Sequence, residues 1–405
     1  MGHPKGGAAM TQTLFSSTTT PLTPPRTDED RSAWLRLLRS RGVGPQTFFR
    51  LMGEHGTAAA VLDVLPGLAA RAGVTQYAIA SEGDIAAELR AGRKAGAQLV
   101  CFGDAAYPTP LADIPDPPPM LWVRGDIRHL ARPAIAIVGA RNASSLGERM
   151  ARKLAQDLGA AGFVTVSGLA RGIDAAVHGA TLGTGTVAVL AGGVDVAYPA
   201  ENAALLTRIA QQCVVLSEQP MGLNPQARHF PRRNRIVSGL AAGLVVVEAA
   251  ARSGSLITAR LAAEQGREVM AVPGHPFDAR ASGCNLLLRD GATLIRGADD
   301  VIEALGPPSA LVIEPRCAPL PRVESRLAPR QPDVTDGPAP RADPRPDPLR
   351  DHATAIMARL GPTPLPEDQL IRDLRLPATQ VAPMLMELEL DGRIQRHAGG
   401  MVSRT

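Results

Sequence analysis

Six short apolar runs recur between residues 134 and 272, and each is followed by a longer stretch with the spacing of a helix. The runs are 134–138, 163–167, 186–190, 213–217, 244–247 and 268–272. Continuous apolar runs of this length are typical of strands buried on both faces, and their alternation with helices is typical of parallel sheets. The pattern predicts an α/β domain over residues 96–306, with a Rossmann-like, doubly wound and mostly parallel sheet. The Pro-interrupted apolar segments just before residue 126 form the lead-in to this sheet.

Residues 28–95 instead show helical periodicity, which is broken at 41–45 by two glycines and a proline. We expect a small helical domain of the helix-hairpin-helix or SAM-like type. Such a domain either presents backbone N–H groups to phosphates or serves packing alone, and the sequence leaves both open. A second turn is expected at 65–68, where Pro66 adjoins Gly67.

The two ends of the chain have different patterns. Residues 1–27 have no apolar core of signal-peptide length and are expected to form a disordered tail. Residues 307–350 are rich in proline and are expected to be a linker. Residues 351–405 predict a winged helix from three helices and two strands, which are expected at 353–360, 367–374, 378–391, 392–396 and 401–402.

Composition adds limits to this picture. Hydrophobic residues make up 45% and charged residues 20%, as in soluble globular proteins, and no run of about 18 apolar residues could span a membrane. A net charge of +4 is compatible with nucleic-acid binding without requiring it. The four cysteines are scattered without a CxxC pair, which argues against a disulfide framework or a zinc site and favours a reducing cytoplasm.

Glycines, hydroxyls and arginines follow the strands of the predicted sheet. Ligands of doubly wound sheets bind beyond the carboxyl ends of the strands, where glycine permits tight turns, helix N-termini attract anions and arginine matches phosphate oxygens. We also expect the helix that begins near Gly147 to offer free N–H groups, whereas Asp174 either contributes to a phosphate site or only caps its helix. The candidate phosphate-binding residues at these turns are Gly139, Arg141, Ser167, Gly168, Arg171, Gly172, Asp174, Gly192, Gly193, Ser253, Gly254 and Ser255.

The densest positive charge lies at 228–235, where four arginines flank one of the seven phenylalanines. Arginines for phosphates and an aromatic ring for a base are the two components of a single-strand groove. The alternative is the solvated start of a helix. The candidates in this segment are Phe230, Arg232, Arg233, Asn234 and Arg235.

Several classes of site are disfavoured by missing motifs. The glycine spacing after the first strand is not GxGxxG, and the second strand ends in Ser167 where a dinucleotide site usually has an acidic residue. No HExxH, GxSxG or P-loop sequence occurs, and His178 and His275 have no second ligand at metal-binding spacing. We therefore expect no cofactor and no metal, and we expect each of these histidines to pack in the interior or to lie at the surface.

Eight motifs occur in one order: GAR-x5-G, SGLARGID, AGGVDVAYPAEN, SEQPMG, HFPRRNRIVSGLA, VEAAARSGSLITA, AVPG and GCNLLLRDGA. Over roughly residues 99–305 this series resembles the DNA-processing protein A (DprA, also called Smf) family. The resemblance implies a cytoplasmic bacterial protein that binds single-stranded DNA without sequence preference and loads the RecA recombinase during natural transformation. It also implies a homodimer formed through the Rossmann-like domain, and it implies no catalysis.

Position by position, the resemblance places the arginine-rich segment on Phe230, Arg232, Arg233, Asn234 and Arg235. It places the phosphate pocket on Gly139, Arg141, Ser167, Gly168, Arg171, Gly172 and Asp174. Two positions depart from the family pattern. Ala140 stands where the family usually has Ser or Thr, and Leu146 where it often has an aromatic residue. Relative to the family pattern, this sequence therefore lacks one hydroxyl and one aromatic stacking surface.

Two other functions remain to be weighed. Related domains that hydrolyse nucleoside monophosphates have a PGGxGT-x2-E pattern, and the turn at Gly192–Gly193 lacks its glutamate. Alternatively, the winged helix is the main DNA-binding part and the sheet a dimerisation scaffold. The expected recognition helix at 378–391 carries Glu387, Glu389 and Asp391 and no Lys or Arg, which disfavours entry into a DNA groove.

Overall fold

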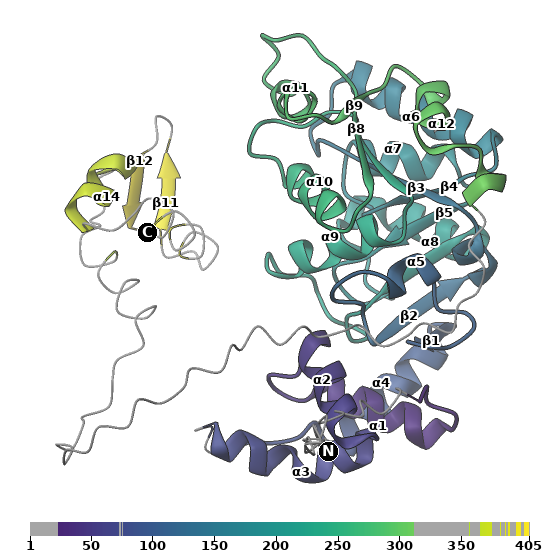
Figure 1. The fold of residues 1–405 in the computed structure, drawn as a ribbon, viewed down its shortest axis with the longest axis vertical. Helices are drawn as coiled ribbons and strands as arrows, with labels where there is room; N and C mark the ends of the chain where they lie inside the picture. Colours follow the sequence, from purple (N-terminus) through teal and green to yellow (C-terminus); the bar gives the residue numbers. More distant parts are fainter. Residues whose placement is uncertain are drawn as a thin grey trace, which may run out of the picture. The chain divides into compact units, whose positions relative to one another are not determined.

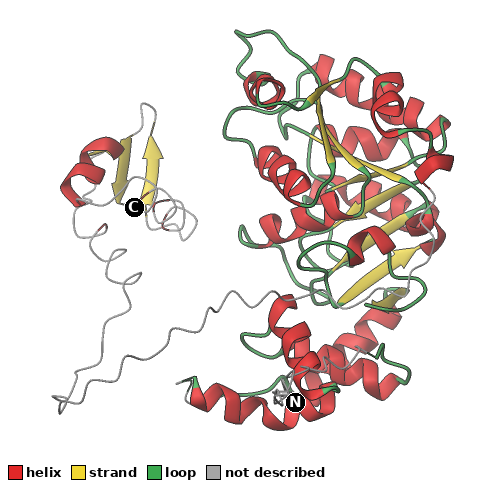
Figure 2. Ribbon diagram, in the orientation of Figure 1, coloured by secondary structure: helices red, strands yellow, loops and turns green. Residues whose placement is uncertain are grey.

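A computed structural model shows how the chain folds (Figures 1 and 2). It describes residues 23–72, 74, 76–311, 356, 365–374, 381, 385, 388, 394–397 and 401–404. The chain divides into two compact units, 1–324 and 325–405. Each unit is described by itself. No helix of the described residues combines the length and apolarity that crossing a membrane requires.

The N-terminal part is a helical domain whose four helices bury their apolar faces together. They are α1 (Asp28–Arg39), α2 (Pro45–His55), α3 (Ala58–Arg71) and α4 (Glu82–Lys94). Thr27 and Asp30 form a capping box at the start of α1, and the aromatic rings of Trp34 and Phe48 meet edge to face with centroids 5.0 Å apart. The helical domain with a turn at 41–45 is therefore confirmed.

The second turn expected at 65–68 is wrong, because α3 continues through Pro66. Proline removes one backbone hydrogen bond inside a helix. Here Val61, Leu62 and Leu65 are all buried on the same face of α3, and their packing offsets that loss.

The second part of this unit is a nine-stranded sheet in the order β1-β2-β6-β5-β4-β3-β7-β8-β9. Its strands are β1 (Ala97–Cys101), β2 (Met120–Gly125), β3 (Ala134–Val138), β4 (Val164–Ser167), β5 (Thr186–Val189), β6 (Val214–Ser217), β7 (Gly243–Val246), β8 (Glu268–Ala271) and β9 (Thr293–Leu294). Strands β3 to β9 are parallel, and β2 pairs antiparallel with β6 and β1. All six predicted strands are confirmed within one residue at each end.

The helices cover both faces of the sheet, as the doubly wound prediction requires. On one face Ile135 and Ile137 pack with α6 (Ser145–Ala160), α7 (Ile173–Ala180) and α12 (Ala298–Leu305). On the other face Ala136 and Val138 belong to the cluster that includes α9 (His229–Gly239) and α10 (Gly254–Glu264). The remaining elements are α5 (Thr109–Ala112), α8 (Ala203–Gln212), α11 (Ser282–Arg289), η1 (Ile127–Ala131), η2 (Ala200–Asn202) and η3 (Pro308–Leu311).

The chain reverses direction across the sheet at β3. From β3 it proceeds outward through β4, β5 and β6, and it then crosses to β7, on the other side of β3, before β8 and β9. In open α/β sheets this reversal opens a crevice at the carboxyl ends of the two central strands, which is the usual ligand position. The relevant segments here are those that follow β3 and β7.

The C-terminal unit contains β10 (Leu365–Pro366), α14 (Glu367–Leu374), β11 (Ile394–His397) and β12 (Met401–Arg404). Its three-stranded antiparallel sheet has the order β10-β12-β11. The predicted helix at 367–374 and the hairpin are confirmed, and β10 is an addition to the prediction. The expected helices 353–360 and 378–391 lie for the most part outside the described residues.

The expected tail and linker also lie largely outside the described residues, at 1–22 and 312–350. A few residues of each expected segment are described. Pro25 is buried, and Leu311, at the end of η3, packs against the sheet domain.

Candidate nucleic-acid interface

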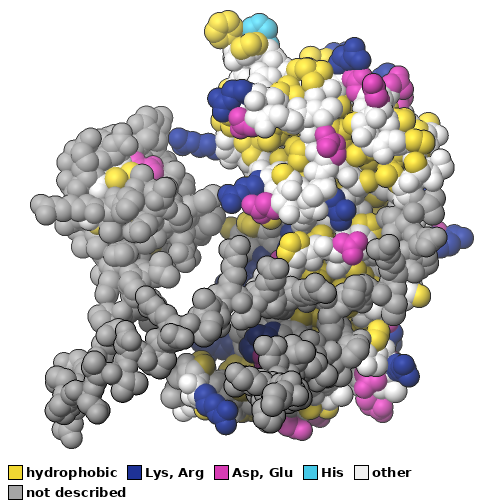
Figure 3. Space-filling model, viewed as in Figure 1, with side chains coloured by type: hydrophobic (Ala, Val, Ile, Leu, Met, Phe, Trp, Pro, Cys, Tyr) yellow, Lys and Arg dark blue, Asp and Glu magenta, His cyan; other side chains and the backbone are white. Residues whose placement is uncertain are grey.

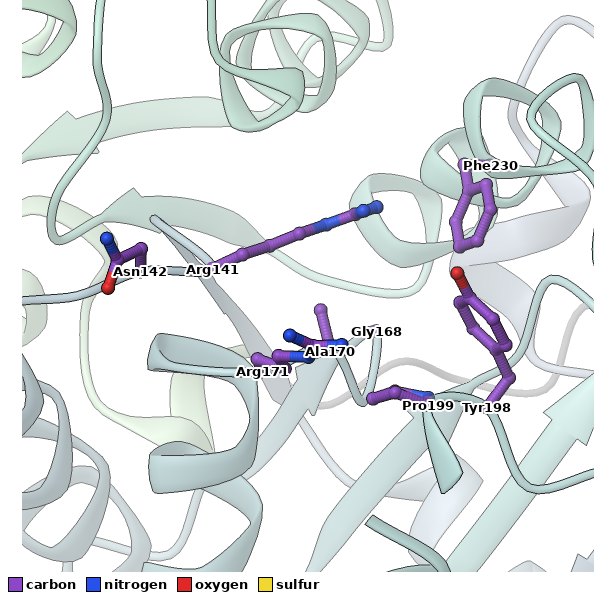
Figure 4. A pocket seen from close by; sticks show the side chains of 8 residues that line it. All are labelled: Arg141, Asn142, Gly168, Ala170, Arg171, Tyr198, Pro199 and Phe230. Atoms are coloured by element: carbon purple, nitrogen blue, oxygen red, sulfur yellow. The ribbon is translucent and has the colours of Figure 1, made fainter. Parts of the chain in front are cut away.

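A cavity of about 380 Å³ opens at the carboxyl ends of β3, β4 and β5. We call it the cleft. Four of the predicted candidates, Arg141, Gly168, Arg171 and Phe230, come together in its lining, with Phe230 supplied by α9 (Figure 4). The full lining is Arg141, Asn142, Gly168, Ala170, Arg171, Tyr198, Pro199 and Phe230. Turns that are far apart in the sequence thus form one site, as the carboxyl ends of parallel strands require.

The cleft contains a pair of aromatic rings. The ring centroids of Tyr198 and Phe230 are 5.7 Å apart with the planes inclined by 53°, and the guanidinium carbon of Arg141 lies 5.1 Å from the centroid of Phe230. Tyr198 is 48% exposed, which leaves its ring accessible to a base. Tyr198 is not among the residues predicted from the sequence, although an aromatic residue shortly after a glycine-rich turn was a usable signal.

The second arginine of the cleft is held by a carboxylate. Nε of Arg171 lies 2.7 Å from Oε1 of Glu201, and both side chains are more than half exposed. The amide of Asn202 donates to the carbonyl oxygens of Leu169 and Ala170, at 3.0 and 3.3 Å. The segment at 201–202 therefore fixes the turn that carries Arg171.

Asp174 does not cap its helix. The N-cap of α7 is Gly172, with φ of 69°, and Asp174 is the second residue of the helix. The Asp174 carboxylate accepts the backbone N–H groups of Gly168 and Ala170, both at 3.2 Å. The expectation of a cap is wrong, because the side chain points back into the preceding turn. These two N–H groups are consequently satisfied within the protein.

A polar network lies beneath this turn. Burial raises the pKa of Asp174, while the nearby Arg233 opposes that rise. His178 is fully buried and makes a 2.7 Å hydrogen bond through Nδ1 to Oγ1 of Thr186, and burial lowers the pKa of His178 to about 3. Ser167, another predicted candidate, is buried and donates to the carbonyl oxygen of Ile137 at 2.7 Å. Ser167 and His178 thus belong to the support of the cleft rather than to its surface.

The arginine-rich segment divides between the surface and the interior, since it folds into the first turns of α9. Arg228 and Arg232 are exposed. Arg233 is 7% exposed and donates to the carbonyl oxygen of Val189 at 3.2 Å. The structure therefore brings some of the expected arginines to the surface and turns others inward.

Arg235 is the second inward arginine of this segment. Its Nε lies 3.1 Å from Oδ2 of Asp116, its Nη2 bonds to Glu218, and its side chain is 8% exposed. Asn234 is half-buried. Arg233 and Arg235 thus do not offer their guanidinium groups to a ligand in this structure.

The turn after β5 has glycines for close packing. A Cβ atom on Gly192 would lie 2.9 Å from Cδ of Pro225, and one on Gly193 would lie 2.8 Å from the carbonyl oxygen of Pro220. These contacts press the turn against the segment at 220–225. Gly192 and Gly193 are absent from the cleft lining and contribute to its scaffold.

The N-terminus of α6, expected to offer free N–H groups, already has an anion. The carboxylate of Glu248, the second residue after β7, accepts the backbone N–H of Ser144 at 2.9 Å and also bonds to its hydroxyl. Ser144 Oγ in turn accepts the N–H of Gly147 at 2.9 Å. A side chain on Gly147 would overlap the Glu248 carboxylate. The crevice between β3 and β7 is thus filled by the protein itself.

The serines after β7 also have internal partners. Ser253 caps α10 by accepting the N–H of Ser255, and Gly254 is the first residue of that helix. Ser255 Oγ donates to the carbonyl oxygen of Gly139 at 2.8 Å. These residues connect two turns, and none of them lines the cleft.

Both departures from the family pattern can be placed. The carbonyl oxygen of Ala140 accepts the N–H of Ile173 at 3.2 Å, so residue 140 contributes its backbone to the turn. Leu146, the second residue of α6, is 68% exposed. An apolar surface therefore stands where an aromatic ring is usual.

Comparisons with known proteins agree with this domain order. Residues 98–306 match the sequence family described as DNA recombination-mediator protein A. Residues 28–91 match the DprA-like N-terminal HHH domain, and residues 339–400 match the DprA winged helix domain.

Individual relatives cover most of the same region. DNA processing protein DprA of Bacillus subtilis is 42% identical over 230 residues, covering 56% of this chain and 77% of that protein. Protein Smf of Escherichia coli is 37% identical over 299 residues, covering 73% and 74%. The crystal structure of DprA from Streptococcus pneumoniae superposes with a TM-score of 0.54 at 33% identity, covering 68% of this chain and 93% of that one. On these matches the chain belongs to the DNA recombination-mediator protein A family.

Proposed function

We propose that this protein binds single-stranded DNA without sequence preference, and that the cleft holds the strand. The observation that carries the proposal is the stack of Arg141 on Phe230 beside Tyr198. Aromatic faces accept any base, and arginine neutralises the adjacent phosphates. No carboxylate is among the residues that line the cleft.

The proposed contacts differ from those expected of a phosphate cradle built on backbone amides. The N–H groups of Gly168, Ala170 and Ser144 are bonded to Asp174 and Glu248. The exposed arginines 141, 171, 228 and 232 are therefore the proposed phosphate contacts, with Phe230 and Tyr198 contacting bases. Asn142 is the remaining polar side chain in the lining.

The proposal is tested with fluorescent single-stranded and double-stranded oligonucleotides. We expect Arg141→Ala with Arg171→Ala to lose most of the single-strand affinity. Arg149→Ala, at an exposed position of α6 outside the cleft, is the matched control and should retain it. Affinity should fall with salt at a slope of about −0.7 per phosphate contact. An unchanged double variant, or binding insensitive to salt, would contradict the proposal.

The proposal extends to the cellular role that the family resemblance implies. There the protein acts without catalysis in a bacterial cytoplasm, as a homodimer that loads the RecA recombinase onto incoming DNA during natural transformation. Light scattering tests the dimer. RecA filament assembly on DNA coated with single-strand binding protein, with and without this protein, tests loading.

A further inference from the structure

Exposed apolar side chains gather along the carboxyl edge of the sheet. Within the described part of the sheet domain, five large hydrophobic side chains are exposed, and four of them follow carboxyl ends of strands. Leu146 follows β3, Tyr198 follows β5, Ile257 follows β7 and Phe277 follows β8. Single exposed apolar residues need no explanation, but a row along one functional edge does.

Phe277 is the extreme member of this row, with 95% of its surface exposed. It lies in the segment between β8 and α11, which projects beyond the sheet in Figure 1. In Figure 3 a histidine and hydrophobic side chains gather at the projection at the top of the view. The ring of His275 lies 5.6 Å from that of Phe277, inclined by 38°.

The Phe277 segment is held by its own hydrogen bonds. Gly274 and the Asn285 side chain exchange two hydrogen bonds, of 3.2 and 3.0 Å, which close the base of the loop. Within the loop, the N–H of Asp278 donates to the carbonyl oxygen of His275 at 2.9 Å, and the N–H of Phe277 donates to Nδ1 of His275 at 3.3 Å. The aromatic ring is thus presented to solvent by an ordered turn.

Hydrogen bonds link this loop, through the turn after β7, to the turn that carries Arg141. At its end, the N–H of Gly283 donates to the carbonyl oxygen of Ala249 at 2.7 Å, in the turn after β7. The turn after β7 is also hydrogen-bonded to the turn that carries Arg141. Ser255 donates to the carbonyl oxygen of Gly139, and Glu248 accepts the N–H of Ser144. Three neighbouring turns therefore form one continuous edge.

The charges on this edge favour a polyanion. Arg252 lies on the middle turn and Arg280 on the Phe277 loop, and both are exposed. Both neighbouring acids keep their charge but are bonded elsewhere than to a guanidinium group, since Glu248 binds Ser144, and Oδ1 of Asp278 accepts the backbone N–H of Arg280 at 2.9 Å. Exposed arginines alternating with apolar side chains suit a nucleic-acid strand, which carries a phosphate beside every base.

The distance along the edge also fits one continuous strand. In the sheet order, β8 is two strands from β3. Neighbouring strands are about 4.8 Å apart, so the Arg141 and Phe277 turns begin about 10 Å from each other. That corresponds to about three nucleotides at a stacked spacing of 3.4 Å.

We propose that Phe277, supported by His275, is a second stacking surface for the single-stranded DNA that leaves the cleft, with Arg252 and Arg280 contacting phosphates on either side. This inference rests on the proposed function of the cleft. It adds a second binding surface, formed by the loop between β8 and α11, and it predicts that strand length matters.

The test uses the full-length protein with thymidylates of 2 and 20 nucleotides. The dinucleotide is shorter than the separation of about three nucleotides, so it should fill the cleft alone, whereas the 20-mer should also reach the Phe277 loop. Phe277→Ala should weaken binding of the 20-mer about five- to fiftyfold, as expected for loss of one stacked base, and should leave binding of the dinucleotide unchanged. Val64→Ala, at an exposed position in the helical domain, is the control. A side chain 95% exposed can be truncated without loss of the fold.

A direct readout comes from Phe277→Trp, which should retain 20-mer affinity and show quenched tryptophan emission with the 20-mer but not with the dinucleotide. Trp34 and Trp122 are both buried, so their emission should not respond to a stacked base. This inference would be overturned if Phe277→Ala and wild type bound the 20-mer with equal affinity, or if Phe277→Trp showed no quenching. The proposed function of the cleft would still stand in that case, provided that Arg141→Ala loses binding. If the wild type binds neither oligonucleotide, the proposed function itself fails.

Discussion

The guanidinium group of Arg233 lies directly against the Cα atom of Gly168, in the space that a side chain at residue 168 would need. Gly168→Ala should therefore displace a buried arginine from its hydrogen bond to Val189 and from the neighbourhood of Asp174. We expect a loss of about 1–3 kcal/mol in unfolding free energy, together with weaker single-strand binding. Urea denaturation and fluorescence anisotropy measure the two effects.

Gly179→Ala is the matched control for this substitution. Gly179 lies in α7, and no atom comes within 4 Å of a Cβ atom added there. Alanine at that position should stabilise the helix slightly and leave DNA affinity unchanged. Equal behaviour of the two alanine variants would show that the contact between Arg233 and Gly168 has no energetic weight.

The arginines of α9 should separate into two classes on substitution. Arg235→Ala leaves Asp116 and Glu218 without their shared partner and should cost about 3–5 kcal/mol of stability. Arg232→Ala removes an exposed charge and should preserve stability while reducing the salt slope of DNA binding by about 0.7. Thermal unfolding and salt titrations of both variants check this separation, and a destabilised Arg232→Ala would count against it.

Glu201 should compete with DNA for Arg171. Because the pair is largely exposed, it contributes at most about 1 kcal/mol, so Glu201→Gln should raise single-strand affinity by no more than about fivefold. The gain should vanish when Arg171→Ala is also present. A gain that persists in the double variant would place the effect of Glu201 elsewhere.

Glu248 should stabilise the turn that carries Arg141. Glu248→Ala leaves the N–H and hydroxyl of Ser144 without their acceptor and should cost about 1–3 kcal/mol. Glu248→Gln keeps an acceptor oxygen but removes the negative charge at the N-terminus of α6, so the unfolding free energy should fall by about 0.3–1 kcal/mol. Urea denaturation measures both, and the reverse ranking would contradict this role.

Acid should destabilise the fold through His178. Its folded pKa of about 3 lies below the value of 6.5 for an unburied histidine, so the native state binds fewer protons than the unfolded chain. The stabilisation that comes from keeping His178 neutral in the fold is complete above pH 6.5 and is lost as the pH falls towards 3. The total loss in unfolding free energy is on the order of 5 kcal/mol.

His178→Asn isolates this effect, since asparagine can still reach Thr186 Oγ1 but does not titrate. The variant should lose less stability than wild type between pH 6.5 and 4, as followed by circular dichroism during urea unfolding. Parallel pH profiles would exclude His178 as the cause.

The six strands β3 to β8 were predictable from the sequence because each is a continuous apolar run bounded by polar turns. Arg233 and Arg235 show where such prediction ends. The sequence of their segment indicates a high positive charge but not which side chains point inward. That depends on how α9 packs against strands distant in the sequence, which brings Arg233 to Gly168 and Arg235 to Glu218. A helix cap was likewise one of the two roles expected of Asp174, because a cap is a local pattern and a bond back into the preceding turn is not.

The carboxylate of Glu248 has a consequence for small molecules aimed at this fold. A free phosphate that entered between β3 and β7 would have to displace a carboxylate attached to the same chain, whose effective concentration is in the millimolar range or above. Nucleotide analogues shaped for the crevice of a dinucleotide-binding sheet should therefore be poor inhibitors of this protein. Compounds directed at Arg141 and Phe230 avoid such a competitor, since the tethered carboxylate at the cleft, that of Glu201, is paired with Arg171 instead.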